Sequence, residues 1–224
     1  MKENDKEKHI IWDWNGTLLN DVTSAVAALN KMLALRGIPP TTIDFYRENF
    51  GFPVRPFYAK VGVDLEHEEW NRICVDFHRF VNEEPKILRS DAMSALSLAR
   101  EKGMRQSILS ALREDMLLHD VKAAGVSDFL DAVYGVDNLD GATKLSRGQD
   151  LLRHIKAIRG ATEFFFVGDT LHDAEVAKAL GARCILVAGG HQSSARLAAA
   201  GVPVADSLVA AVGNIAESAS AATS

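Results

Sequence analysis

Runs of apolar residues in this sequence end directly before Asp13, Ser110 and the pair Gly168-Asp169. An apolar run that stops abruptly at polar residues is typical of a buried strand that reaches a loop. The carboxyl ends of parallel strands meet at one edge of a sheet, and ligands bind beyond that edge. The pattern therefore predicts one site that contains Asp13, Ser110 and Asp169.

Carboxylates dominate this predicted site. A carboxylate at a strand end, followed by Gly16 and Thr17, can act as a nucleophile beside backbone N–H groups that are free to hold an anion, although the same pattern also fits an ordinary turn. Asp169 and Asp173 add oxygens that, together with Asp13, suit a hard divalent cation such as Mg²⁺. Asp173 alone also fits the first turn of a helix, where an acid complements the backbone N–H groups.

Ser110 and Lys144 offer groups that can hold an anion. The Ser110 hydroxyl can donate a hydrogen bond to a phosphoryl oxygen, or it can cap the helix that follows. Lys144 can supply positive charge to a phosphoryl group, or it can be one more solvated lysine. The residues alone leave both pairs of interpretations open.

Strands and helices alternate through most of the chain. Strands are indicated at 10–12, 107–109, 164–167 and 185–188, and more weakly at 132–134 and 202–205; helical spacing is found at 92–99, 116–124, 151–158 and 174–180. Continuous apolar strands that alternate with helices are typical of a parallel sheet covered on both faces. We therefore predict an α/β fold with a Rossmann-like parallel sheet as its core.

Residues 21–89 break this alternation. Apolar residues at 22, 26, 29 and 33, and again at 70, 73, 77 and 80, have helical spacing, and no convincing strand lies between them. We predict a small α-helical cap domain at 21–89, inserted after the first strand, and a core domain made of 1–20 and 90–224. The Ala- and Ser-rich segment 217–224 is predicted to be a disordered tail.

Composition limits the classes of partner. The 224 residues are 47% hydrophobic, and 25 Lys+Arg against 30 Asp+Glu give a net charge of −5, which argues against nucleic acid or an anionic membrane as the partner. No run approaches the roughly 18 apolar residues of a membrane span, and the charged first nine residues do not form a secretory signal. Cys74 and Cys184 are expected to be reduced, buried thiols. We expect a cytoplasmic protein with a small-molecule partner, as a monomer or a homodimer.

In their order and spacing, these residues resemble the four motifs of the haloacid dehalogenase-like hydrolase superfamily. The motifs stand here as DWNGTLL at 13–19, SILS at 107–110, Lys144 ahead of a helix, and FFVGDTLHD at 165–173. The helical insert resembles the smaller cap of this family. The segment GGHQSSARLAAAGVPVADSL looks like that of its phosphoglycolate phosphatase-type members.

This resemblance implies a Mg²⁺-dependent phosphatase that hydrolyses a small phosphate monoester, with phosphoglycolate as the favoured example. Asp13 would attack phosphorus and carry an aspartyl-phosphate intermediate, while Lys144 and Ser110 would hold the phosphoryl oxygens. Asp13 would stay ionised beside a cation and Lys144.

The resemblance also implies further ligands. Mg²⁺ would be bound by Asp13, Asp169 and the backbone carbonyl of Asn15, with Asp173 in support directly or through water. Substrate-binding roles are implied for Gly16, Thr17, Ser110, Ala111 and Lys144. Arg55 lies in a segment, 51–58, that looks like the substrate-facing loop of the cap. It could pair with an anionic leaving group, or it could be an ordinary exposed arginine.

Asn15 departs from the family pattern. The phosphatases of this family carry a second aspartate there, which protonates the leaving group and then activates water. An amide cannot exchange a proton at useful pH, so acid-base help worth about 10²–10⁴-fold is missing. The chain is then a phosphatase that works without this acid, a protein with another reaction such as phosphotransfer or cleavage of a C–P or carbon–halogen bond, or a phosphate-binding module. The Asp169/Asp173 pair favours a metal and so argues against a dehalogenase.

Two other classes of protein fit this sequence less well. A receiver-like binding module would lack the helical insert, and a nucleotide-dependent oxidoreductase would carry a G-x-G-x-x-G after the first strand. Trp12 is predicted to be a core residue and Trp14 a candidate for the pocket wall. His172 and His191 are interpreted as ordinary loop or helix-start residues.

Overall fold

The computed structural model describes residues 7–136, 144–160 and 162–218. They contain a sheet of six strands in the order β3-β2-β1-β4-β5-β6, and every neighbouring pair is parallel. The first strand of the chain therefore lies at the centre, between β2 and β4. The strands are β1 (Glu7–Trp12), β2 (Arg105–Arg113), β3 (Ala132–Val136), β4 (Thr162–Gly168), β5 (Arg183–Val187) and β6 (Val204–Ala205).

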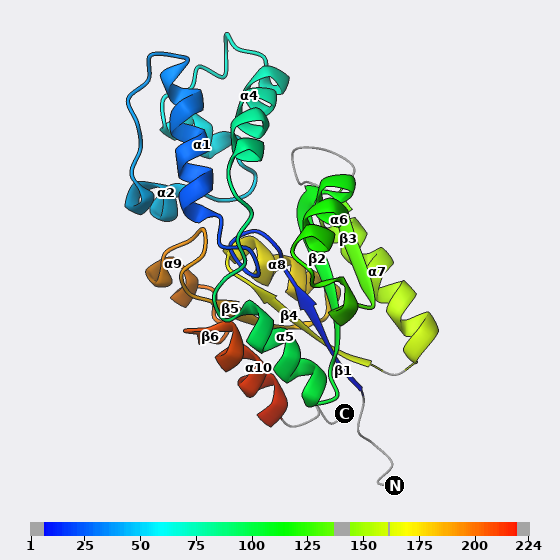
Figure 1. The fold of residues 1–224 in the computed structure, drawn as a ribbon. Coiled ribbons are helices and arrows are strands. Elements are labelled where there is room, and N and C mark those ends of the chain that lie inside the picture. Colours follow the sequence, from blue (N-terminus) through cyan, green and yellow to red (C-terminus); the bar gives the residue numbers. More distant parts are fainter. Residues whose placement is uncertain (1–6, 137–143, 161, 219–224) are drawn as a thin grey trace, which may run out of the picture.

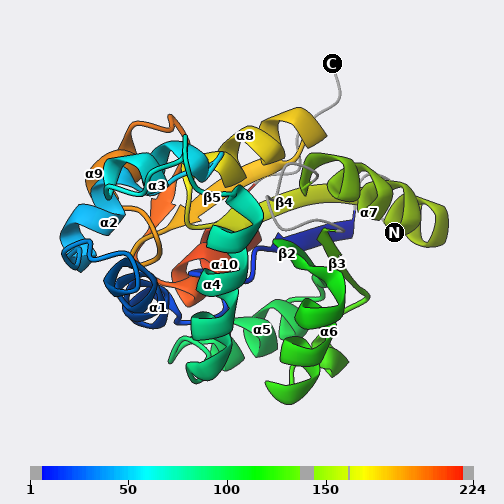
Figure 2. The same cartoon turned by 90° about the horizontal axis from the view of Figure 1, so that it is seen from above.

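Helices cover both faces of this sheet, as predicted (Figure 2). Successive strand residues point to opposite faces, so Ile10 and Trp12 pack into one hydrophobic layer and Ile11 into the other. The first layer is completed by α5 (Ala92–Glu101), α6 (Glu114–Ala123) and α10 (Leu208–Glu217), and the second by α7 (Lys144–Arg159), α8 (Leu171–Leu180) and α9 (Ser194–Ala198). The short 3₁₀ helix η1 (Ser127–Phe129) precedes β3. The predicted α/β fold class is confirmed.

Helices alone fill the chain between β1 and α5. They are α1 (Val22–Ala34), α2 (Ile43–Asn49), α3 (Arg55–Lys60) and α4 (Trp70–Glu83), and they form a hydrophobic cluster of their own. Figure 1 shows this group beyond the carboxyl ends of the strands. The chain segments that enter and leave it meet at an antiparallel bridge between Leu19 and Leu88. The exact domain boundaries, at 21 and 89, stay a prediction.

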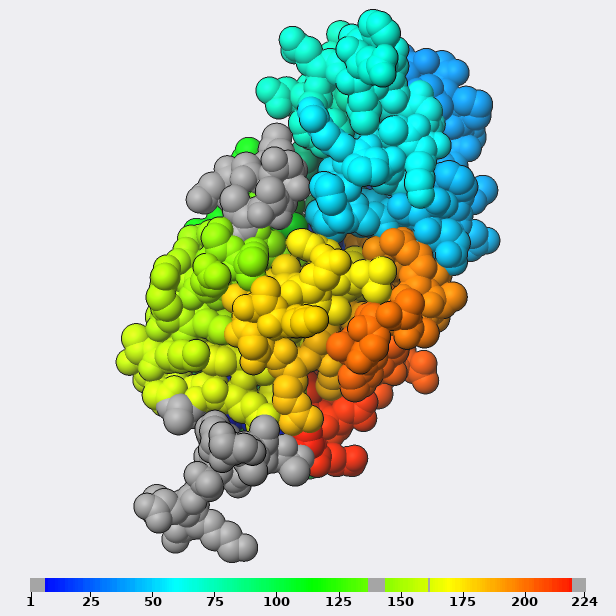
Figure 3. Space-filling view, turned by 180° about the vertical axis from the view of Figure 1, so that it is seen from behind, coloured from blue at the N-terminus to red at the C-terminus, as the bar shows by residue number. Residues whose placement is uncertain are grey.

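Hydrogen bonds join the cap to the core on one side. The Arg47 guanidinium of α2 donates to the carbonyls of Gly189 and Gly190, which follow β5. In the opposite direction, Arg196 and Gln192 of the core donate to the carbonyl of Phe50. Figure 3 shows these cyan and orange segments in contact. The cap is therefore held over the carboxyl end of β5.

Several elements are longer than the apolar pattern predicts. The charged start of β1 extends its pairing with β4 back to Glu7, because Lys8 finds acceptors at the carbonyls of Ile215, Ala216 and Ser218. β2 continues past Ser110 to Arg113, with a shift of register against β3 after Leu109.

Four further expectations from the sequence can be compared with the structure. Lys144 is the first residue of α7 and does not precede it. Glu217 ends α10, so the helix includes the first residue of the predicted tail, and 219–224 lie outside the described residues. Cys74 and Cys184 are buried and neither forms a disulfide, as expected. Within the described residues, no helix is long and apolar enough to cross a membrane.

The buried His9 on β1 gives a prediction for the pH dependence of stability. Its Nε2 lies 2.9 Å from the Ser107 hydroxyl, and burial lowers its pKa to about 4. The unfolded chain binds a proton near pH 6.5 and the folded chain does not, so this neutral histidine costs stability as the pH falls from 6.5 towards 4. The unfolding free energy of His9→Gln minus that of the parent protein should therefore increase by up to about 3 kcal/mol as the pH falls from 7 to 4. Urea denaturation at several pH values measures this, and a difference that is constant over that range contradicts it.

Candidate active site

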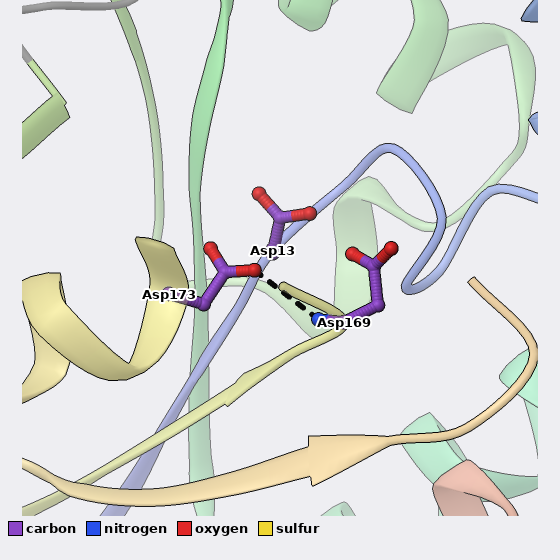
Figure 4. Close-up of side chains that lie close together, drawn as sticks. All are labelled: Asp13, Asp169 and Asp173. Atoms are coloured by element: carbon purple, nitrogen blue, oxygen red, sulfur yellow. Dashed lines mark hydrogen bonds between the residues drawn. The ribbon is translucent and has the colours of Figure 1, made fainter. Parts of the chain in front are cut away.

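Three buried carboxylates converge at the carboxyl edge of the sheet (Figure 4). Asp13 directly follows β1, Asp169 directly follows β4, and Asp173 lies in the first turn of α8. One oxygen from each lies within 4.8 Å of the others. The prediction that these three residues meet at one site is therefore matched by the structure.

Lys144 binds two of these carboxylates. Its Nζ donates to Asp13 Oδ1 at 2.5 Å and to Asp173 Oδ1 at 2.7 Å, and the residue is 2% exposed. The alternative of a solvated surface lysine is therefore wrong. Ser110 is buried in the same site, and its Oγ accepts a hydrogen bond from the backbone N–H of Leu112. Its hydroxyl proton is left to donate elsewhere.

The site holds more buried negative than positive charge. Asp13, Asp21, Asp169 and Asp173 face two buried side chains that can carry positive charge, Lys144 and His191. With all six groups charged, the excess is two negative charges. A divalent cation would balance it.

The pKa values reflect this imbalance. Burial, opposed by Lys144 and assisted by the charges of Asp173 and Asp169, raises the pKa of Asp13 to about 8. Burial likewise raises the pKa of Asp169 to about 6. The pKa of Asp173 is lowered despite its burial, because Lys144 stabilises its charge. With its protein neighbours alone, Asp13 does not stay fully ionised at neutral pH, so the expected ionised state depends on the cation as well as on Lys144.

These residues fit a hard cation such as Mg²⁺. Carboxylate oxygens are the ligands that Mg²⁺ prefers, and a cation would offset the burial and the neighbouring negative charges that raise the pKa values of Asp13 and Asp169. Asp173 already uses its oxygens. One binds Lys144, and the other accepts from the backbone N–H groups of Asp169 and Thr170 and from the Thr170 hydroxyl. The interpretation of Asp173 as an acid in the first turn of a helix is therefore confirmed, and its role in metal binding stays a prediction.

Two glycines allow the Asp169 carboxylate to lie where it does. A Cβ atom at Gly16, whose φ is +74°, or at Gly190 would collide with this carboxylate. In the space that remains, Asp169 accepts hydrogen bonds from the Thr17 hydroxyl at 3.0 Å and the His191 backbone N–H at 2.6 Å. The turn after β1 and the loop after β5 thus both position Asp169.

Asn15 is held by an acid that the sequence analysis did not single out. Its Nδ2 donates to Asp21 Oδ2 at 2.7 Å, while Asp21 Oδ1 accepts from the Gly16 backbone N–H at 2.7 Å and lies 3.2 Å from His191 Nε2. The sequence analysis expected backbone N–H groups here to be free to hold an anion. The Gly16 N–H is not free, because it donates to Asp21. Because a carboxylate only accepts hydrogen bonds, it fixes which end of the Asn15 amide faces Asp21.

His191 belongs to the site and is not the ordinary loop residue that was expected. Burial works against its charge, but the adjacent Asp21 carboxylate prevails and raises its pKa to about 9. On its other side, Nδ1 lies 2.9 Å from the hydroxyl of Tyr46 in the cap. Its position after β5, at the same sheet edge as Asp13, was the signal available in the sequence. Asp21 and Tyr46 gave none, because their contacts arise from the way the cap is placed.

One cavity opens above these groups and continues into the cap. On the core side it is lined by residues that include Asp13, Asn15, Ser110, Ala111, Lys144, Asp169 and Asp173. Gly16 and Thr17 are not on its wall. Trp14 is fully buried in the core, so its interpretation as a pocket residue is wrong, whereas Trp12 is a core residue as predicted.

Two other residues singled out in the sequence lie outside this cavity. Arg55 is exposed at the start of α3, and its guanidinium lies 4.9 Å from the ring centre of Trp70. The structure does not bring Arg55 to the carboxylates. His172 is the second residue of α8, where its ring lies against Phe52.

Comparison with known proteins agrees with this fold and geometry. Curated phosphoglycolate phosphatases from Caulobacter vibrioides and Rhodobacter capsulatus are 26% and 22% identical to this chain, over 81% and 83% of its length and 79% and 86% of theirs. A solved haloacid dehalogenase-like hydrolase from Streptococcus pneumoniae superimposes with a TM-score of 0.71 at 15% identity, covering 93% of this chain and 98% of its own. The family model described as haloacid dehalogenase-like hydrolase matches residues 10–187. With its three carboxylates and Lys144 at the sheet edge, the chain belongs to the haloacid dehalogenase-like hydrolase family.

Proposed function

We propose that this hydrolase is a Mg²⁺-dependent phosphatase that cleaves a small phosphorylated metabolite, a phosphate monoester, through an aspartyl-phosphate on Asp13. The observation that carries the proposal is the buried Asp13 carboxylate, 2.5 Å from Lys144 and grouped with Asp169 and Asp173, on the wall of a cavity. The phosphatase activity named for both curated relatives supports it.

Asp13 is the nucleophile in this proposal. Its carboxylate oxygen forms a bond to phosphorus while the bond from phosphorus to the alcohol oxygen breaks, and the departing alkoxide takes a proton from water. A water molecule then attacks the phosphorus and the Asp13–phosphorus bond breaks. The proton released by this water neutralises the hydroxide left by the first step, and inorganic phosphate leaves with the carboxylate regenerated. Lys144 and Ser110, both on the cavity wall, hold the phosphoryl oxygens during both steps.

Asp13, Asp169 and the Asn15 backbone carbonyl are the proposed ligands of Mg²⁺, with Asp173 in support. When bound, the cation neutralises charge on the phosphoryl oxygens and keeps the carboxylates ionised. Because burial and neighbouring acids raise the pKa of Asp13, a bound cation would favour the ionised carboxylate that attacks phosphorus.

Asn15 limits what this chain can do with protons. Its amide cannot protonate the leaving alcohol, and the Asp21 carboxylate beside it is already an acceptor for three neighbouring groups. We propose that Asn15 presents its carbonyl oxygen to the cavity as a hydrogen-bond acceptor, since its amino end is bound to Asp21. A water molecule that donates to this oxygen would be oriented without losing its proton to the side chain.

The same Asn15 supports a second candidate, a protein that binds a phosphorylated ligand and turns it over slowly or not at all. Phosphate binding without product release in the presence of Mg²⁺ would favour this candidate. It would also leave the assignment of Lys144 and Ser110 to the phosphoryl group intact.

Replacement of the nucleophile tests the proposed reaction. In Asp13→Asn, we expect Mg²⁺-dependent phosphate release from monoesters to fall by at least about a thousandfold, because an amide does not attack phosphorus. Without Mg²⁺ the unfolding free energy should not fall, since the variant removes one of the buried negative charges and Lys144 keeps its bond to Asp173. Asp115→Asn, at an exposed position on α6, is the matched control and should retain full activity. A variant with an unchanged rate would rule out Asp13 as the nucleophile.

The contact between Asn15 and Asp21 gives a separate prediction about stability. Asn15→Asp places two carboxylates in contact inside the protein, so we expect a loss of about 1–3 kcal/mol of unfolding free energy. The double variant Asn15→Asp/Asp21→Asn restores one amide and one carboxylate, and its unfolding free energy should exceed that of Asn15→Asp alone. Urea denaturation of the four proteins gives the coupling energy. A coupling energy of zero would be inconsistent with the Asn15–Asp21 hydrogen bond.

A further inference from the structure

The cavity above Asp13 has two chemically different ends. Its volume is about 180 Å³, far more than a single water molecule needs, so it can hold an organic group of several atoms. The core end carries the carboxylates, Ser110 and Lys144. The cap end is lined by aromatic and aliphatic side chains from all four cap helices and the loops between them, with Leu29, Phe50, Phe52, Trp70, Phe77 and Val81 among them.

Aromatic rings make up much of this cap end, and they support one another. Tyr58 and Trp70 meet edge to face with ring centres 5.3 Å apart, and Tyr46 and Phe57 do the same at 5.3 Å. Phe50 stacks on Tyr46 at 4.7 Å. Such packing fixes the position of each ring, so the wall is apolar and already formed before a ligand enters.

Cations available to an anionic leaving group are scarce on the described wall. Lys144 is bonded to Asp13 and Asp173, and His191 lies against Asp21. Lys86 is exposed, and its ammonium donates to the Val81 carbonyl. Arg55 is exposed, lies over the Trp70 ring and is not on the cavity wall. The segment 137–143, outside the described residues, has the sequence DNLDGAT and so contains no Lys, Arg or His.

His78 adds one polar atom to the cap end. It lines the cavity, and its buried Nδ1 has no hydrogen-bond partner among the described residues. Burial lowers the pKa of His78, with help from Arg113 and Lys86, so the ring is neutral at pH 7. A neutral imidazole can donate or accept a hydrogen bond, but it brings no positive charge to balance that of a carboxylate. The cap end is therefore largely apolar, and its neutral polar groups come from His78, Asn82 and Tyr58.

We propose that the cap end of this cavity binds an uncharged, largely apolar leaving group, so that the substrate is the phosphate monoester of an aromatic or bulky alkyl alcohol. This inference rests on the proposed function and narrows it. A small anionic leaving group such as glycolate would leave its carboxylate without a partner against the rings, and burying an unpaired charge is costly. An aromatic group removes its own apolar surface, and that of the rings, from water.

Two matched pairs of ligands test this preference. Benzyl phosphate and phosphoglycolate are the ester substrates, and 2-phenylethylphosphonate and 3-phosphonopropionate are their analogues that cannot be hydrolysed. With Mg²⁺ present, we expect kcat/KM for benzyl phosphate to exceed that for phosphoglycolate by about tenfold or more. Calorimetry should give a Kd for 2-phenylethylphosphonate lower than that for 3-phosphonopropionate by a similar factor.

Two phenylalanines of α4 provide the variants. Phe77 lines the cavity, whereas Phe80 of the same helix packs in the cap cluster and is not on the cavity wall. Phe77→Ala should raise the Kd of 2-phenylethylphosphonate and lower kcat/KM for benzyl phosphate by about tenfold, with values for the carboxylate ligands unchanged. Phe80→Ala should leave the preference between the two ligands of each pair unchanged.

The binding and turnover measurements separate the two levels of the proposal. The preference for an apolar leaving group is overturned if 3-phosphonopropionate binds as tightly as 2-phenylethylphosphonate or more tightly, or if phosphoglycolate is turned over faster than benzyl phosphate. The proposed phosphatase function would then still stand. If neither ester is hydrolysed, the proposed phosphatase function is overturned. The binding of the two phosphonates still decides which leaving group the cavity accepts. A Phe77→Ala variant that weakens both phosphonates equally also contradicts the inference, because a ring that contacts only the leaving group cannot do this.

Discussion

The bond from the buried Lys144 ammonium to Asp13 and Asp173 is the interaction on which the rest of the site depends. It joins the carboxyl end of β1 to the first turns of α7 and α8, which are three elements far apart in the sequence. Four buried carboxylates face only two buried cations there, so this edge of the sheet carries an excess of negative charge without a metal ion. Burial is the main cause of the raised pKa values of Asp13 and Asp169, and the charges of neighbouring carboxylates raise them further. Stability is given up here in favour of a site prepared for a cation and a phosphoryl group.

A second group of polar contacts connects this charged edge to the cap. Asp21 lies at the start of the cap and binds Asn15, the Gly16 backbone and His191, while His191 reaches Tyr46 of α2. Position 15 thus holds an amide, and the Asp21 carboxylate stands one hydrogen bond away from it. Above these contacts the wall changes to aromatic rings. The floor of the cavity therefore suits a phosphoryl group and the roof suits an apolar one.

Much of this arrangement follows from short-range patterns in the sequence. The strand ends at Asp13 and Asp169 could be located because parallel strands share one carboxyl edge, and the helical spacing of the insert indicated a cap. Asp21, His191 and Tyr46 could not be found in this way, since their contacts depend on where the cap rests. Trp14 and Arg55 lie off the cavity wall for local reasons. The turn after β1 places Trp14 in the core, and Arg55 is exposed at the start of α3, over the ring of Trp70. Residue type alone did not reveal that the pKa of Asp13 is raised.

In the proposed site, the carboxylate cluster destabilises the folded protein by itself, and a divalent cation completes it. The thermal unfolding midpoint, measured with and without millimolar Mg²⁺ for the parent protein and for Asp169→Asn, is the decisive measurement. We expect Mg²⁺ to raise the midpoint of the parent protein by a few degrees, because a ligand that binds the folded state stabilises it. Without Mg²⁺, Asp169→Asn should be at least as stable as the parent protein, and it should gain much less from the cation. A parent protein whose midpoint does not respond to Mg²⁺ would show that the cluster does not bind the cation.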